Sequence, residues 1–136
     1  MDELLYDVQK HFKKVRQFRE SQEEIITALL SGRSVLANMP TGSRKSLCYQ
    51  YPAIKLPGLT LVITPLIALI HDQTANFNLN FPDGMFRAAF LVGDMSPEEY
   101  KEQMQAIRSG RCKLLYVSPE RLLSPKFIRF AKQLEV

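Results

Sequence analysis

Apolar and polar positions along this chain change their spacing several times, and the changes predict alternating helices and strands. Apolar residues recur at helical spacing over residues 3–12, which predicts a first helix. Ser21 and Glu24 have the spacing of a capping box, so a second helix is expected to begin there and to end before Gly32.

Beyond Gly32, short apolar runs bounded by turn residues predict strands. The expected strands cover residues 34–38, 59–64, 87–92 and 113–117. A helical pattern follows each one. The expected helices cover about 45–55, 66–77 with Pro65 in its first turn, 97–109, and two short segments opened by the Ser-Pro pairs at 118–119 and 124–125. The last helix is expected to turn Phe127, Ile128, Ala131 and Leu134 inward.

The alternation of strands and helices predicts an α/β fold, a parallel sheet with helices on both faces. All strands of such a sheet point the same way. The segments after Asn38, Ile63, Val92 and Val117 are therefore expected to meet at one edge, where open α/β sheets bind ligands.

Composition narrows the function classes only slightly. The chain has 136 residues, a net charge of +4 and 46% hydrophobic residues, which suits one modest globular domain. The charge weakly favours an anionic partner such as nucleic acid, and a solvated basic surface accounts for it equally well. Cys48 and Cys112 have no metal-site spacing and indicate reduced thiols in the cytoplasm. The most apolar run, "LTLVITPLIALI", is too short to span a bilayer, so no membrane association is expected.

The stretch "NMPTGSRKSLCYQ", residues 38–50, looks like a phosphate-binding loop that opens into a helix. Gly42 allows close backbone approach, Lys45 would reach the β- and γ-phosphates of a nucleotide, and the Ser46 hydroxyl would bind Mg²⁺. Met39 and Arg44 occupy the two positions where the strict motif has glycine. On this stretch alone, a chance strand, loop and helix is an equally good interpretation.

Three further stretches change that balance. "PTGSRKSLCYQYPA", "VITPLIALIHDQ" and "LLYVSPERLL" occur in this order, each at the end of an expected strand, and "QFRESQEEII" precedes them. Together they resemble the first catalytic domain of the RecQ-type DNA helicases, in the superfamily of the DEAD/DEAH-box proteins. The resemblance runs from about Leu4 to Phe130 and implies a RecA-like fold of the P-loop NTPase type.

The resemblance also implies a nucleotide site. ATP would be held by Met39, Pro40, Thr41, Gly42, Ser43, Arg44, Lys45 and Ser46, with Lys45 as the catalytic residue and Ser46 as the Mg²⁺ ligand. Phe18, Arg19 and Gln22 match the motif that reads adenine, whereas Val15 stands where the family usually has an aromatic residue that stacks on the base. Considered alone, Gln22 would be an exposed residue in the first turn of a helix.

A DNA track is implied as well. Single-stranded or partly unwound DNA would contact Thr64, Pro65, Gln73, Ser118, Pro119 and Arg121. Purely structural interpretations of these residues stay open. Ser-Pro is a common helix start, and the basic stretch 10–19 could be a solvated face. The run of Leu66, Ile67, Leu69 and Ile70 is expected to be mostly core.

The residues needed for turnover are not all present in this sequence. The family's Asp-Glu-Ala-His box and its second RecA-like domain have no counterpart in residues 1–136. We therefore expect an incomplete RecA-like domain, the N-terminal portion of a helicase ATP-binding domain. It would belong to a RecQ-like ATP-dependent 3′-to-5′ DNA helicase of DNA repair and recombination, and would be inactive as a fragment. The alternatives are a non-enzymatic nucleic-acid- or protein-binding product of a truncated helicase gene, or a product with no role of its own.

Overall fold

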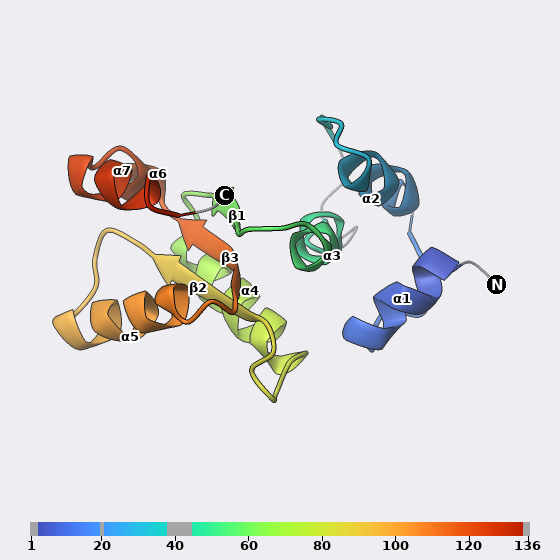
Figure 1. The fold of residues 1–136 in the computed structure, drawn as a ribbon, viewed down its shortest axis with the longest axis horizontal. Coiled ribbons are helices and arrows are strands. Elements are labelled where there is room, and N and C mark those ends of the chain that lie inside the picture. The colour runs from blue at the N-terminus through green and yellow to red at the C-terminus, as the bar shows by residue number, and fades with distance from the viewer. Residues whose placement is uncertain (1–2, 20, 38–44, 135–136) are drawn as a thin grey trace. The chain divides into compact units, whose positions relative to one another are not determined.

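The computed structural model describes residues 3–19, 21–37 and 45–134, which divide into two compact units, Met1–Leu56 and Pro57–Val136 (Figure 1). The first unit contains helices α1 (Glu3–His11), α2 (Gln22–Leu30) and α3 (Leu47–Lys55). The second unit contains, in chain order, β1 (Thr60–Ile63), α4 (Ile67–Leu79), β2 (Arg87–Leu91), α5 (Pro97–Arg108), β3 (Cys112–Val117), α6 (Pro119–Leu122) and α7 (Pro125–Ala131).

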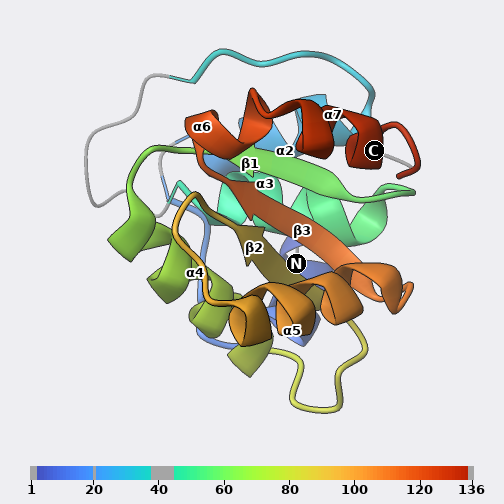
Figure 2. The same ribbon diagram turned by 90° about the vertical axis from the view of Figure 1, so that its left-hand side faces the viewer.

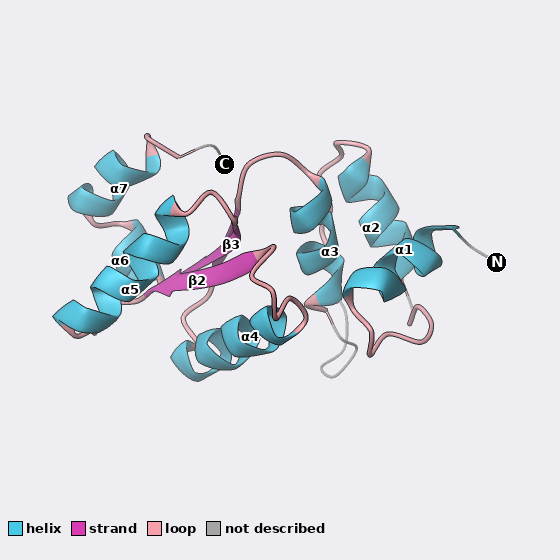
Figure 3. Ribbon diagram, turned by 60° about the horizontal axis from the view of Figure 1, so that its bottom comes forward, coloured by secondary structure: helices cyan, strands magenta, loops and turns pink. Residues whose placement is uncertain are grey.

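The second unit is built on a parallel sheet with the strand order β1-β3-β2 (Figure 2). Neighbouring residues of a strand point to opposite faces of a sheet, and the side chains of β2 contact a different helix on each face. Phe90 meets His71 of α4, with ring centroids 4.7 Å apart, whereas Ala89 and Leu91 pack with residues of α5. Helix α4 therefore covers one face, and α5 and α7 cover the other (Figure 3). The predicted parallel sheet with helices on both faces is confirmed for this unit.

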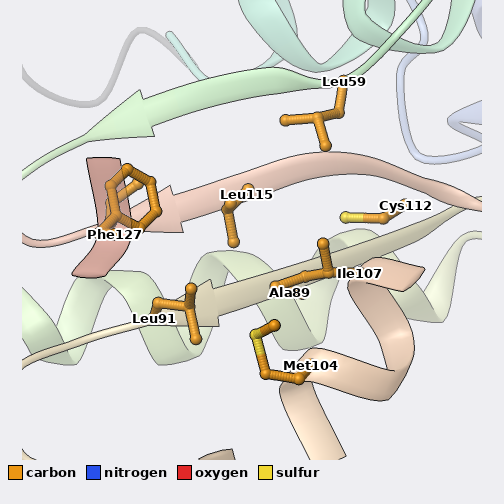
Figure 4. Packing of buried hydrophobic residues seen from close by; sticks show 9 residues of the cluster. Leu59, Ala89, Leu91, Met104, Ile107, Cys112, Leu115 and Phe127 are labelled. Atoms are coloured by element: carbon orange, nitrogen blue, oxygen red, sulfur yellow. The ribbon is translucent and has the colours of Figure 1, made fainter. Parts of the chain in front are cut away.

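The core between the sheet and its α5 face is a continuous apolar cluster (Figure 4). Its buried members are Leu59, Ala89, Leu91, Met104, Ile107, Cys112, Leu115, Val117 and Phe127. The central strand β3 supplies Cys112, Leu115 and Val117 to this cluster and is hydrogen-bonded to β1 on one side and to β2 on the other. The cluster fixes the three strands side by side, which brings their carboxyl ends to one edge.

The predicted strand at 34–38 is wrong for the part that the structure describes. Residues 34–37 have no strand conformation, Val35 is 37% exposed and Leu36 is 99% exposed. Asn38 lies outside the described residues. A strand this short is stable only through a hydrogen-bonded ladder and a covered face, and β1, β2 and β3 are the only strands that pair in the described part of the chain.

Three local predictions also need correction. Ser21 does precede α2, but its side chain makes no capping hydrogen bond. Pro65 lies before α4 instead of in its first turn, because the helix begins at Ile67 and the Leu66 amide donates to Thr64 Oγ1 at 3.3 Å. Ile128 was expected to face inward and is 45% exposed. By contrast α5 begins as predicted, since Ser96 Oγ accepts from the Glu99 amide at 3.1 Å.

The first unit contains a polar link between α1 and α3. The Tyr51 hydroxyl donates to a carboxylate oxygen of Asp7, and Lys55 Nζ lies 3.0 Å from the same oxygen. The hydrogen bond from Tyr51 and the charge of Lys55 hold the pKa of Asp7 below its ordinary value. The ionised carboxylate therefore stabilises the packing of α1 on α3.

An Asp7→Asn variant is expected to lose about 1–2 kcal/mol of the free energy of unfolding at neutral pH, because hydrogen bonds to a charged acceptor are stronger than neutral ones. The pKa of Asp7 is lower in the folded than in the unfolded chain, so its contribution is present above the unfolded pKa of about 4 and lost as pH falls through the folded pKa. Urea unfolding followed by circular dichroism at several pH values measures this. Asp94→Asn, at an exposed carboxylate, is the control, and equal losses in both variants would contradict the prediction.

Candidate functional site

The carboxyl ends of the three strands meet through backbone hydrogen bonds. The Thr64 amide, just after β1, donates to the Val117 carbonyl oxygen at 3.2 Å. The Ser118 amide, just after β3, donates to the Leu91 carbonyl oxygen at 3.3 Å. The predicted meeting of the segments after Ile63, Val92 and Val117 is thus confirmed. The segment after Asn38 belongs to the other unit and begins outside the described residues.

Arg121 of α6 ties this edge together. Its Nε and Nη2 donate to the Val92 carbonyl oxygen at 3.2 and 2.8 Å. Its guanidinium carbon lies 5.6 Å from the centroid of the Tyr100 ring, within cation–π range. The side chain expected to contact DNA therefore spans from α6 to the connection between β2 and α5. These hydrogen bonds hold the backbone after β2 in place.

The other residues expected on the DNA track differ in how much of them reaches the surface. Pro65 is exposed, and Thr64, Gln73 and Pro119 are half-buried. Ser118 is 1% exposed, and its hydroxyl has no hydrogen-bond partner within the described part of the chain. Ser118 thus contributes its backbone to the edge, while its side chain points into the unit.

An exposed apolar strip flanks the same edge, against the expectation that this run is mostly core. Only Ile70 is buried, whereas Leu66 is 60% exposed and Ile67 and Leu69 are each 42% exposed. Ile63 at the end of β1 is 52% exposed. Helical spacing alone could not reveal this, because exposure depends on which elements cover a face.

The phosphate-loop residues are described only at their C-terminal end. Met39, Pro40, Thr41, Gly42, Ser43 and Arg44 lie outside the described residues. Lys45 is exposed, and Ser46 is the N-cap residue of α3. The Lys45 carbonyl accepts from the Cys48 amide at 3.0 Å, and the Ser46 carbonyl accepts from the Gln50 amide at 2.9 Å. An exposed ammonium and a hydroxyl therefore lie together at the start of a helix, where the dipole favours phosphate.

The adenine motif is arranged differently from the expectation for Gln22. This residue is 1% exposed, and its Oε1 accepts from the Arg19 amide at 2.7 Å. Phe18 is half-buried and Arg19 is exposed. The carboxamide oxygen holds the loop before α2 in place, and it can accept from adenine only if it releases or shares the Arg19 amide.

Sequence reasoning did not find the hollow beside this motif. Lys14, Arg16, Gln17 and Arg19 line a cavity of about 400 Å³ in the first unit. Gln9 Nε2 donates to the Arg16 carbonyl oxygen at 3.0 Å and helps to shape the loop. The acid-free stretch 10–19 was the available signal, and periodicity could not show that its basic residues enclose a space.

Two features are absent from the part of the chain that the structure describes. The described residues contain no group of three His, Cys, Asp or Glu side chains placed to hold a metal ion. Within the same residues, no helix is both long and apolar enough for a bilayer crossing.

Comparison with known proteins gives one family. The sequence profile of the DEAD/DEAH box helicases matches residues 19–135. The ATP-dependent DNA helicase RecQ of Haemophilus influenzae is 43% identical over 114 residues, which cover 84% of this chain and 18% of that protein. The ATP-dependent DNA helicase Q-like 5 of Arabidopsis thaliana is 41% identical over 82% of this chain and 12% of its own length. RecQ of Bacillus subtilis is 37% identical over 93% of this chain and 21% of its own length.

One solved structure shows the fold. The crystal structure of a hypothetical ATP-dependent RNA helicase from Sulfolobus tokodaii matches with a TM-score of 0.70 and 24% identity, over 98% of this chain and 37% of that one. This likeness agrees with the RecA-like fold expected from the sequence. The chain spans about a fifth or less of the length of the curated relatives given above.

Proposed function

Because this chain belongs to the DEAD/DEAH box helicase family, with RecQ-type proteins among its relatives, we propose that it is the ATP- and DNA-binding N-terminal segment of a RecQ-like ATP-dependent 3′-to-5′ DNA helicase. The observation that carries the proposal is the parallel sheet edge where the segments after β1, β2 and β3 meet. The segments after β1 and β3 contain most of the residues expected on the DNA track, and open α/β sheets bind their ligands at such an edge.

In this proposal the start of α3 receives the phosphates of ATP. Lys45 would place its ammonium group against the β- and γ-phosphates, and the Ser46 hydroxyl would help to hold Mg²⁺. The helix N-terminus adds a favourable dipole. The bound Mg²⁺ would neutralise phosphate charge. Residues 1–136 contain no Asp-Glu-x-His motif at a strand end, so we propose nucleotide binding without turnover for them alone.

The proposed DNA contact is made to the sugar-phosphate backbone of single-stranded DNA, by hydrogen bonds from the edge and by the attraction of the chain's net charge of +4. The residues proposed to contact the phosphates are Thr64 and Pro65 after β1, Gln73 on α4 and Pro119 after β3. Arg121 and Ser118 hold the backbone of this edge in place. We also propose a cytoplasmic location for the chain. The second candidate is a non-enzymatic binder of nucleic acid or protein that takes no part in an ATP-dependent helicase and would use the same edge.

We expect weak, sequence-independent binding to single-stranded DNA, with a dissociation constant in the micromolar range or higher. Affinity should fall with salt at a slope of roughly −0.7 per phosphate contact, because counterions are released on binding. Fluorescence anisotropy of a labelled oligothymidine at several salt concentrations measures the slope. Binding that does not change with salt would overturn the electrostatic mode.

Arg121 variants separate shaping of the edge from direct phosphate contact. Arg121→Lys keeps the charge but cannot reproduce the paired bonds to the Val92 carbonyl, so both Arg121→Lys and Arg121→Ala should weaken DNA binding several-fold. Arg129→Ala makes the same charge change as Arg121→Ala at an exposed residue of α7 and serves as the control. Full binding by Arg121→Lys would instead identify Arg121 as a phosphate contact.

A further inference from the structure

We propose that the groove between α5 and α7 binds an acidic peptide segment that carries an apolar side chain. The groove has a volume of about 650 Å³ and lies wholly within the second unit. Tyr100, Lys101, Met104 and Arg108 line it from α5, and Lys126 lines it from α7. Both helices pack on the same side of the sheet (Figure 3), so the groove lies beside the apolar cluster. Its Tyr100 end adjoins the carboxyl edge, because Arg121 of that edge lies over the Tyr100 ring.

The described rim of the groove is basic. Lys101, Arg108 and Lys126 are exposed, and no acidic residue among the described ones lines the groove with them. None of these three cations forms an ion pair with a described carboxylate. Three cations around one hollow raise the local concentration of anions and give a carboxylate-bearing partner several places to bind.

The floor of the groove is apolar. Met104 is 8% exposed and belongs to the core cluster, and the Tyr100 ring packs against that cluster. Lys126 Nζ lies 5.2 Å from the Tyr100 ring centroid, and the Arg121 guanidinium carbon lies 5.6 Å from it. Cations therefore already occupy the π-system of the ring.

This combination favours a peptide over single-stranded nucleic acid. A base that stacked on Tyr100 would have to displace a cation from the ring, and without stacking the apolar floor would have no matching group on a sugar-phosphate chain. A peptide matches both the apolar floor and the basic rim, because an apolar side chain can pack on Met104 while neighbouring carboxylates reach the cations. Gln105 lies in the same groove and offers hydrogen bonds to peptide backbone.

The probe is a short fluorescein-labelled peptide in which glutamates flank a leucine, titrated with the whole chain and followed by anisotropy. Lys101→Glu and Lys126→Glu should each weaken binding roughly three- to tenfold, since each replaces an attraction by a repulsion at a partly exposed site. Lys132→Glu makes the same charge change at the other end of α7, outside the groove, and should bind as the parent does. Circular dichroism of each variant checks that the fold is kept.

Two control probes decide between occupants. A peptide with glutamine in place of glutamate should bind at least several-fold more weakly, and so should one with serine in place of leucine. A labelled single-stranded oligonucleotide should bind Lys101→Glu as well as it binds Lys132→Glu, which makes the same charge change. No peptide binding, equal binding by all three lysine variants, or selective loss of oligonucleotide binding in Lys101→Glu would each overturn the proposal.

Discussion

A Leu115→Ala variant is expected to lose about 2–5 kcal/mol of the free energy of unfolding, the typical cost of deleting a buried leucine side chain. Leu115 is fully buried in β3, the central strand of the sheet, and belongs to the cluster that joins the sheet to α5 and α7 (Figure 4). The substitution leaves a cavity in the middle of the sheet, because Leu115 is paired with Leu61 of β1 and Ala89 of β2 in the two ladders. The hydrogen-bonded strands cannot move together to fill it. Domains are stable by only about 5–15 kcal/mol, so this loss is a large share of the total.

Urea unfolding followed by circular dichroism measures the loss as a lower transition midpoint. Leu123→Ala removes the same atoms from a leucine that is 76% exposed in the same unit, and its effect should stay within about 0.5 kcal/mol. A comparable loss in the two variants would show that the sheet is not the stabilising core of the unit. The Leu115→Ala variant should also bind single-stranded DNA less well under conditions where part of it is unfolded.

Lys45→Ala should weaken binding of an ATP analogue with Mg²⁺ by roughly ten- to hundredfold. The reason is the loss of a charge-assisted hydrogen bond to phosphate, worth about 1.5–3 kcal/mol. Lys45 is exposed at the start of α3, so its replacement leaves the packing of the first unit intact. Titration with a fluorescent ATP analogue measures the change. Lys13→Ala, at another exposed lysine of the first unit, is the control, and equal affinity in both variants would remove Lys45 from the proposed phosphate site.

In the same titration Arg44→Gly should shift affinity the other way, to binding at least several-fold tighter. Arg44 lies outside the described residues, so this expectation rests on the sequence: the motif has glycine there, where the backbone approaches the phosphates closely and a long side chain competes for the space. Weaker binding by the glycine variant would show that the guanidinium is itself a phosphate ligand.

Several features of the site could be foreseen from local chemistry. The helix start at Ser96-Pro97 and the helix end at Gly110, where φ is +84°, follow from the cap and from glycine's freedom, which act within a few residues. The burial of Ile70 also agreed with its apolar pattern. The roles of Arg121 and Gln22 could not be foreseen, because they depend on the Val92 carbonyl and on the Arg19 amide. No pattern of residue types shows which backbone atoms a side chain will reach.

The sequence by itself determined the alternation of strands and helices, the parallel sheet and the family, because periodicity, caps and ordered motifs are properties of residues close together in the chain. Only the tertiary structure decided which apolar residues are covered. Leu36, Leu66 and Ile128 are as hydrophobic as their buried neighbours and are nevertheless exposed, since burial needs a partner element on that face. The groove between α5 and α7 also depends on how the elements pack. Tyr100 and Lys101 come from α5 and Lys126 from α7, and packing of both helices on one cluster brought them together.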